Sequence, residues 1–163
     1  MIYHERAPNN VIDEALKFVE VCRETKTSIR IGTALNPQRR FQIPNDLLSD
    51  SFLVDYLQRL GLRYMQNVDG AKNIDVVCED AVWINFYDKG DYTEEHVHAS
   101  SLSGILYLTD YEGTPTEFTN GQTMEGSLGD IIIFPSDYEH KNPIKESDPE
   151  RITLAFNLKY HEL

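Results

Sequence analysis

Cysteine is scarce in this sequence of 163 residues, which contains only Cys22 and Cys78, and neither belongs to a paired motif. This scarcity excludes a disulfide scaffold and a zinc ribbon, and we expect both thiols to be buried and reduced. No apolar run is long enough to cross a membrane, and the first ten residues, MIYHERAPNN, lack a basic segment followed by an apolar one. We therefore expect a cytoplasmic protein with no membrane partner.

Basic residues are also few, since 15 Lys and Arg stand against 27 Asp and Glu and give a formal net charge of −12. An acidic surface repels nucleic-acid backbones, whose binding depends on Lys and Arg contacts. The pair Arg39-Arg40 could form a local basic patch, but we interpret it as part of a solvated loop. We therefore expect no nucleic-acid partner.

The first sixty residues have the apolar spacing of helices. From Asn10 to Cys22 the apolar residues recur on one helical face, and Asn9 or Asn10 is a suitable N-cap. Helical spacing resumes from Leu47 to Leu60, and Gly61 is a typical C-terminal stop. The sequence therefore predicts two helices in this part of the chain.

From Arg63 onward, short β-prone runs alternate with turn signals such as Asn120-Gly121. The predicted strands are Val76–Val77, Val82–Tyr87, Glu95–His98, Ser103–Leu108, Ile131–Phe134 and Ile152–Leu158. Six or more strands favour a sandwich or barrel with the two helices packed on one sheet face. We expect a single α+β domain over residues 1–163, with helical support over about 1–62 and the β half over about 63–163.

Three of the five histidines share a context. His96 and His98 flank one residue in a predicted strand, where alternate side chains point the same way about 6.6 Å apart. Two imidazoles so placed can converge on one metal ion, and His140, after a buried-type strand and a Pro-containing bend, can add a third. Spacing alone also fits three unrelated histidines. We interpret His4 and His161, near the termini, as surface residues.

Four sequence blocks follow one another between Val82 and Leu158, nearly half of the chain. They are Asn85 to His98, the strand ending in Tyr107, Gly129 to His140, and Pro149 to Asn157. In this order they resemble the Fe(II)/2-oxoglutarate-dependent oxygenase superfamily, and most of all its small prolyl-4-hydroxylase-like branch. The resemblance implies a double-stranded β-helix, which is a jelly-roll or cupin-like barrel, supported by the two N-terminal helices.

The resemblance also implies a role for each matching position. His96 and His140 match the iron-binding histidines, and Arg151 matches the residue that pairs with the far carboxylate of 2-oxoglutarate, for which the planar guanidinium is suited. The other cosubstrate contacts that it implies are Asn85, Tyr87, Tyr107 and Thr153. The implied cofactor is Fe(II), with 2-oxoglutarate and O2 as cosubstrates, and no further catalytic residue is implied apart from the metal ligands.

The chain departs from this family at position 98, where the family has the Asp or Glu of a 2-His-1-carboxylate triad. A neutral imidazole there raises the net charge of the iron site by one unit. We favour His98 as the third ligand, which gives a three-His site like that of cupin-type thiol oxygenases. Otherwise Glu94 or another nearby acid supplies a carboxylate, or water fills the position and the chain is a binding protein or a degenerate enzyme.

A cupin-type three-His metalloprotein is the alternative interpretation, either a 2-oxoglutarate-independent dioxygenase or a binding module. Gly90 before His96 and Gly129 before His140 fit its two motifs. However, the segment from Ala99 to Gly104 lacks the glutamate that a cupin has after its His pair, and a cupin has no use for Arg151. A third interpretation is a metal-free interaction domain of the same fold.

The resemblance implies hydroxylation of a peptide or protein side chain, and a free amino acid or other small molecule stays open as the substrate. An acidic surface suits a basic or neutral partner. The sequence carries no indication of the oligomeric state.

Overall fold

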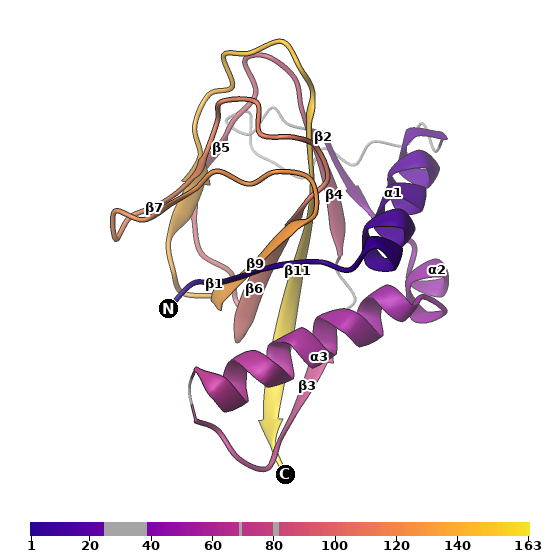
Figure 1. Cartoon of the computed structure of the whole chain (residues 1–163), viewed down its shortest axis with the longest axis vertical. Coiled ribbons are helices and arrows are strands. Elements are labelled where there is room, and N and C mark those ends of the chain that lie inside the picture. Colours follow the sequence, from indigo (N-terminus) through magenta and orange to yellow (C-terminus); the bar gives the residue numbers. More distant parts are fainter. Residues whose placement is uncertain (25–38, 69, 80–81) are drawn as a thin grey trace.

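The protein is described by a computed structural model over residues 1–24, 39–68, 70–79 and 82–163. Its described strands form two facing sheets, and the helices cover the outer face of the larger sheet (Figure 1). The larger sheet contains β1 (Tyr3–Arg6), β2 (Arg39–Gln42), β3 (Ile74–Cys78), β4 (Trp83–Tyr87), β6 (Leu102–Tyr107), β9 (Asp130–Pro135) and β11 (Arg151–Glu162). The smaller sheet contains β5 (Thr93–His96), β7 (Thr116–Phe118), β8 (Thr123–Met124) and β10 (His140–Asn142). The helices are α1 (Asn9–Glu24), α2 (Asn45–Ser49) and α3 (Phe52–Asn67).

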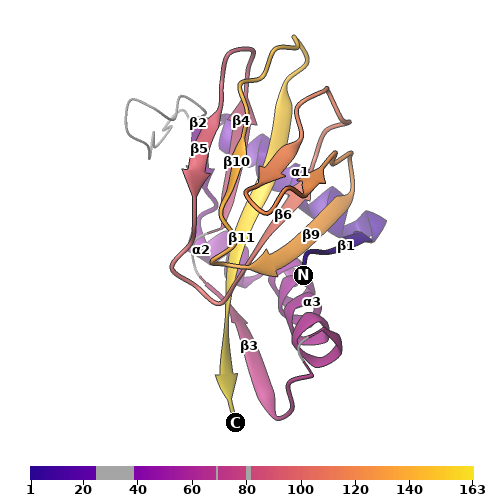
Figure 2. The ribbon, with the colours of Figure 1, turned by 90° about the vertical axis from the view of Figure 1, so that its left-hand side faces the viewer.

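The strands of the larger sheet run in the order β1-β9-β6-β11-β4-β2, and β3 pairs with the C-terminal half of β11. β3 and that half of β11 extend beyond the two facing sheets (Figure 2). The smaller sheet has the order β5-β10-β7-β8, and the Asn120-Gly121 turn lies between β7 and β8 as the sequence predicts. The turn requires a glycine at position 121, because the backbone there has a φ of 93°, which other residues rarely adopt.

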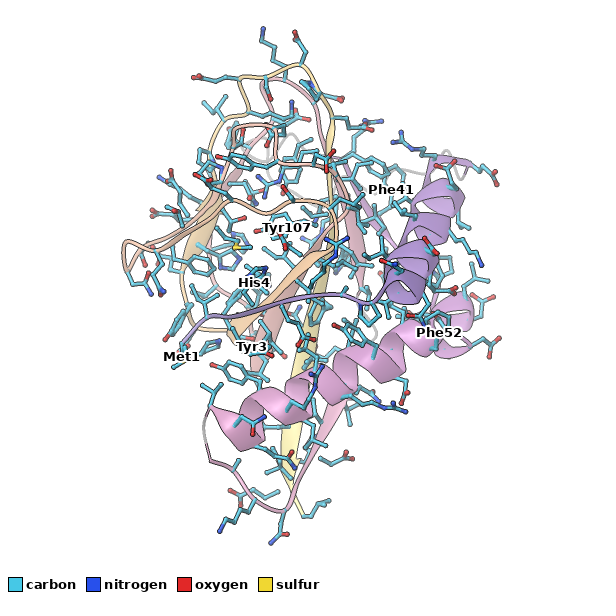
Figure 3. The ribbon with its side chains drawn as sticks, viewed as in Figure 1. Met1, Tyr3, His4, Phe41, Phe52 and Tyr107 are labelled. Carbon is cyan, nitrogen blue, oxygen red and sulfur yellow. The ribbon has the colours of Figure 1, made fainter. Side chains whose placement is uncertain are left out.

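Side chains of the larger sheet alternate between two layers, as strand geometry requires. On β11, Ile152 and Leu154 belong to the main hydrophobic core beneath the helices, whereas Arg151 and Thr153 face a cavity between the sheets. Figure 3 shows the same division, with Phe41 on the helix side and Tyr107 between the sheets. This alternation delivers polar side chains to one internal space.

The helices pack on the larger sheet, with α1 against β4 and α3 against β3. The sequence predicts that Gly61 ends a helix, but this residue lies within α3. A Cβ at this position would come within 2.6 Å of Leu158 Cδ1 and 2.9 Å of Val76 Cγ1. The glycine therefore lets α3 approach the sheet closely.

Both helix starts differ from the sequence prediction. The carbonyl of Pro8 accepts from the N–H groups of Val11 and Ile12, so Asn9 and Asn10 are helical residues instead of caps. The predicted helix Leu47–Leu60 is divided in two, because the Ser51 hydroxyl accepts from the Leu53 N–H and starts α3 afresh.

Two short strands, β1 and β2, lie within residues 1–62, where the sequence predicts helical support. β1 pairs with β9, and β2 pairs with β4 so that Arg40 lies opposite Asn85. Arg39 and Arg40 therefore belong to a strand and are half-buried, not part of a solvated loop. Cys22 and Cys78 are buried, as expected, and no disulfide joins them. No helix in the described part of the chain is long and apolar enough to cross a membrane.

Candidate metal centre

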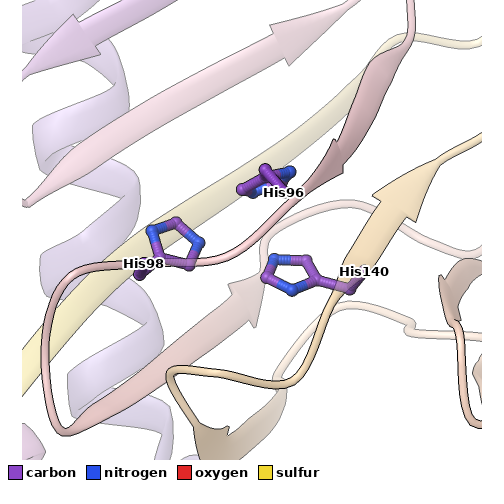
Figure 4. Close-up of side chains that lie close together, drawn as sticks. All are labelled: His96, His98 and His140. Carbon is purple, nitrogen blue, oxygen red and sulfur yellow. The ribbon is translucent and has the colours of Figure 1, made fainter.

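Three histidines meet between the two sheets (Figure 4). His96 is the last residue of β5 and pairs directly with His140, the first residue of β10, and their ring centroids are 4.3 Å apart. His98 follows β5, and its backbone N–H donates to Ser136 O at 2.9 Å. Its ring centroid lies 4.8 Å from that of His96 and 5.2 Å from that of His140. The three side chains that the sequence singled out are thus brought together.

A β-bulge in β5 places His96 toward the cavity. His140 pairs with His96 and Asn142 with Thr93, so two steps on β10 correspond to three on β5. Thr93 and His96 consequently both line the cavity, while Glu94 and its neighbour Glu95 are exposed. In a regular strand Glu94, the alternative carboxylate ligand, would share a face with His96. The bulge removes this relationship, and Glu94 does not belong to the group of side chains that could hold a metal.

The ring nitrogens of these histidines suit metal binding. His96 Nδ1 lies 2.7 Å from Glu94 O, and His140 Nδ1 lies 2.8 Å from Tyr138 O. A carbonyl oxygen only accepts, so each Nδ1 carries the hydrogen and each Nε2 keeps a lone pair for a ligand. The candidate ligand atoms of the three residues all lie within 4.8 Å of one another. Two nitrogens at about 2.1 Å from one ion lie at most about 4.2 Å apart, so small side-chain rotations suffice.

Burial lowers the pKa of all three imidazoles because the protonated form loses hydration. Repulsion from His96 lowers the pKa further, to about 3 for His98 and about 4 for His140. The neutral imidazole is the form that binds a metal, so no proton has to leave at neutral pH. The donor set therefore fits a divalent transition metal.

Arg151 is buried beside this cluster, with 4% of its surface exposed. Its Nη1 donates to Thr114 O at 2.9 Å, and its Nη2 donates to Thr116 Oγ1 at 3.0 Å and Asn142 Oδ1 at 2.8 Å. All three acceptors are neutral, and no described Asp or Glu forms an ion pair with it. A buried cation with only neutral partners is costly, so this position favours an anionic ligand.

Two tyrosine rings flank the Arg151 guanidinium. Its central carbon lies 5.4 Å from the ring centroid of Tyr87 and 5.6 Å from that of Tyr107. The hydroxyls are bonded to threonines, Tyr87 to Thr93 at 2.8 Å and Tyr107 to Thr116 at 2.7 Å. Tyr87 lines the cavity, whereas Tyr107 supports the arginine from outside it.

The cavity is lined by every site residue that the sequence predicted except Tyr107, namely Asn85, Tyr87, His96, His98, His140, Arg151 and Thr153. Asn85 Oδ1 is buried and has no hydrogen-bond partner in the part of the chain that the structure describes, so it is available to a ligand. Sequence reasoning missed Arg40, Trp83 and Asn142, which also line the cavity. Asn142 could have been found because it lies two residues after His140, on the same face of a strand.

Comparison with solved structures finds proteins of the same fold. The chain is similar to a prolyl-4-hydroxylase of Pseudomonas putida, with a TM-score of 0.68 and 16% identity over 97% of this chain and 92% of that one. SnoN, an alpha ketoglutarate dependent epimerase from nogalamycin biosynthesis, gives a TM-score of 0.72 and 13% identity over 99% of this chain and 76% of SnoN. A Trichoplax adhaerens prolyl hydroxylase in complex with a hypoxia inducible factor peptide gives a TM-score of 0.70 and 11% identity over 99% of this chain and 83% of that one.

No protein-family model matches the sequence, and no curated protein does. At identities of 11–16% the likeness to solved structures establishes the fold alone. The chain has the sheet-rich α+β jelly-roll architecture of the 2-oxoglutarate-Fe(II) oxygenases, and the fold class predicted from its sequence is confirmed.

Proposed function

We propose that this protein is an Fe(II)- and 2-oxoglutarate-dependent oxygenase that hydroxylates a peptide or protein side chain or a small molecule. The observation that carries the proposal is one cavity that contains both three neutral imidazoles and a buried arginine with no acidic partner among the described residues. A metal ion and a carboxylate-bearing cosubstrate together satisfy both groups.

His96, His98 and His140 would hold the iron through their Nε2 atoms. The carbonyls of Glu94 and Tyr138 fix the rings of His96 and His140. The buried rings of Phe118 and Phe134 lie 5.6 Å and 4.9 Å from that of His140 and pack beside it. When bound, Fe(II) supplies the O2 chemistry that converts 2-oxoglutarate to succinate and CO2 and oxidises the prime substrate.

Arg151 would bind the far carboxylate of 2-oxoglutarate. Three of its five N–H groups already donate to neutral oxygens, which fixes the guanidinium and leaves two for a ligand. Tyr87 and Thr153 would orient the cosubstrate from the cavity wall, and Asn85 would contact it through its amide. Tyr107 has a supporting role, since its ring lies against the guanidinium.

Anaerobic titration of the protein with Fe(II) and then 2-oxoglutarate tests the proposal. We expect a weak visible charge-transfer band that needs both components, and conversion of 2-oxoglutarate to succinate once O2 is admitted. His96→Ala should abolish iron binding, and Arg151→Gln should weaken 2-oxoglutarate binding while iron binding remains. His161→Ala is the matched control, because His161 is exposed on β11. An iron-loaded protein that neither shows the band nor forms succinate would contradict the proposal.

A second candidate is a cupin-type three-His metalloprotein that does not use 2-oxoglutarate. The observation in its favour is the position of His98, which joins the cluster where a carboxylate ligand is usual in the oxygenases. The same titration separates the two, because this candidate predicts tight iron binding with no effect of 2-oxoglutarate or of Arg151→Gln.

A further inference from the structure

Two consecutive arginines on β2 have opposite surroundings. Arg39 lies opposite Phe86 and Arg40 opposite Asn85, so their side chains leave the sheet on different faces. Arg39 Nη2 forms ion pairs with Glu150 Oε2 at 3.0 Å and Asp88 Oδ2 at 3.3 Å. Arg40 lines the cavity between the sheets.

Arg40 has no anionic partner among the described residues. Its guanidinium carbon lies 4.3 Å from the centroid of the Trp83 ring, and its Nε is buried with no hydrogen bond to a described residue. The Nε of Arg39 likewise has no hydrogen bond to a described residue, but its Nη2 is paired with two carboxylates. A cation–π contact offsets only part of the cost of removing a guanidinium from water. The ring of Trp83, 8% exposed, therefore holds Arg40 in place without neutralising it.

The charged residues that line the cavity have the opposite sign to the net charge of the chain. The chain carries a formal net charge of −12, yet the described residues that line the cavity include Arg40 and Arg151 and neither Asp nor Glu. A metal ion on the three histidines would add further positive charge. Such a site attracts anions, and 2-oxoglutarate at Arg151 accounts for only one of the two arginines.

We propose that Arg40 binds a carboxylate of the prime substrate, which makes the substrate an organic acid, either a free amino or carboxylic acid or an acidic group of a peptide. The assignment to the prime substrate rests on the proposed function; the anion site itself does not. The planar guanidinium, whose central carbon lies over the Trp83 ring, has parallel N–H groups that match the two oxygens of a carboxylate. Arg40 would then set which substrate is accepted and how it is oriented toward the histidines.

Trp83 provides a direct readout, because it is the only tryptophan in the chain and contacts Arg40. The metal-free, full-length protein is titrated with acetate at constant ionic strength maintained with chloride, and tryptophan fluorescence is recorded. We expect a saturable change whose midpoint moves to at least about tenfold higher acetate in Arg40→Gln. The midpoint for Arg40→Lys should lie between those of the unchanged protein and Arg40→Gln, because lysine keeps the charge and lacks the planar guanidinium.

Arg39→Gln is the matched control and should respond to acetate like the unchanged protein. Circular dichroism and urea unfolding of each variant verify that it is folded. The absence of a saturable response in the unchanged protein would overturn the proposal. So would folded Arg40→Gln and Arg40→Lys variants that both respond to acetate like the unchanged protein.

The visible band formed with Fe(II) and 2-oxoglutarate separates this proposal from the proposed function. Arg40→Gln should keep the band. Loss of the band in Arg40→Gln would make Arg40 a cosubstrate anchor and would overturn its assignment to the prime substrate. An acetate response that depends on Arg40 in a protein without the band would support the anion site and count against the oxygenase.

Competition against bound acetate identifies the source of the carboxylate. Free L-amino acids are compared with their amides, and short peptides with a free C-terminus are compared with their amidated forms. Displacement by the acids and not by the amides supports the proposal and shows which source reaches Arg40. Equal displacement by acids and amides, or displacement by none of them, would overturn it.

Discussion

The ring of His140 lies 4.3 Å from that of His96 because the two residues pair directly across β10 and β5. Backbone hydrogen bonding between two strands therefore fixes both side chains relative to each other before any ion is bound. His98 is positioned by a single backbone hydrogen bond to Ser136, in the segment after β5. Neither of its ring nitrogens bonds to a described residue, so it is the member of the cluster with most freedom to adjust to a metal.

Replacing His98 tests whether it is a ligand. We expect His98→Ala to weaken Fe(II) binding by more than the roughly 10- to 100-fold that follows loss of a residue supporting a ligand, because a ligand itself is removed. An anaerobic competition titration with a chromophoric chelator measures the affinity, and His161→Ala is the control on an exposed strand position. Full affinity in His98→Ala would show that our ligand assignment is wrong.

His98→Asp would restore the carboxylate that this fold carries in the usual iron triad. We expect it to bind Fe(II) at least as tightly as the unchanged protein, because an anionic ligand offsets one charge of the ion. His98→Asn, neutral and of similar size, should bind more weakly than His98→Asp. The same chelator competition measures the unchanged protein and the Asp, Asn and Ala variants. An Asp variant that binds Fe(II) as weakly as His98→Ala would contradict this expectation and show that a carboxylate at position 98 is not a ligand.

The sequence predicted the β half well because period-two alternation is a local property of each strand. The strands over Val82–Tyr87 and Ile152–Leu158 carry buried apolar residues on one face and the predicted polar residues on the other. Motif order along the chain then sufficed to expect the histidines and Arg151 in one place.

Features that depend on pairing could not be predicted in this way. The bulge in β5, which turns Glu94 outward, arises from the register between two strands. β2 has only four residues and carries two arginines, and its pairing with β4 is what makes Arg40 a cavity residue. Gly61 has a sequence context typical of a helix end, and only the approach of Leu158 and Val76 explains its place inside α3.

The stability of the metal-free protein should decrease on acidification because of His98. Burial and the neighbouring imidazoles lower its pKa to about 3 in the folded protein, whereas in the unfolded chain the pKa is close to 6.5. Between these values the unfolded chain binds a proton that the folded protein does not, so the free energy of unfolding falls as the pH decreases from about 6.5 toward 3.

Urea unfolding at pH 7, 6, 5 and 4 measures this effect for the unchanged protein and for His98→Gln, which cannot titrate. We subtract the unfolding free energy of the variant from that of the unchanged protein. This difference should become smaller as the pH decreases from 7 to 4, since the other titrating groups are common to both proteins. A difference that stays constant from pH 7 to pH 4 would show that His98 titrates equally in the folded and unfolded states.

Gly126 allows the Tyr107 ring to lie against Arg151, and its replacement should disturb cosubstrate binding from a distance. A Cβ at this position would overlap atoms of the Tyr107 ring, and the centroid of that ring is 5.6 Å from the central carbon of the Arg151 guanidinium. We expect Gly126→Ala to lower the unfolding free energy by about 1–3 kcal/mol, as overpacking does, and to raise the 2-oxoglutarate concentration needed for half of the visible band. Gly61→Ala overlaps Leu158 and Val76, which do not line the cavity, so it should lower stability and leave 2-oxoglutarate binding unchanged. If both variants lose stability and neither changes 2-oxoglutarate binding, Tyr107 does not position Arg151.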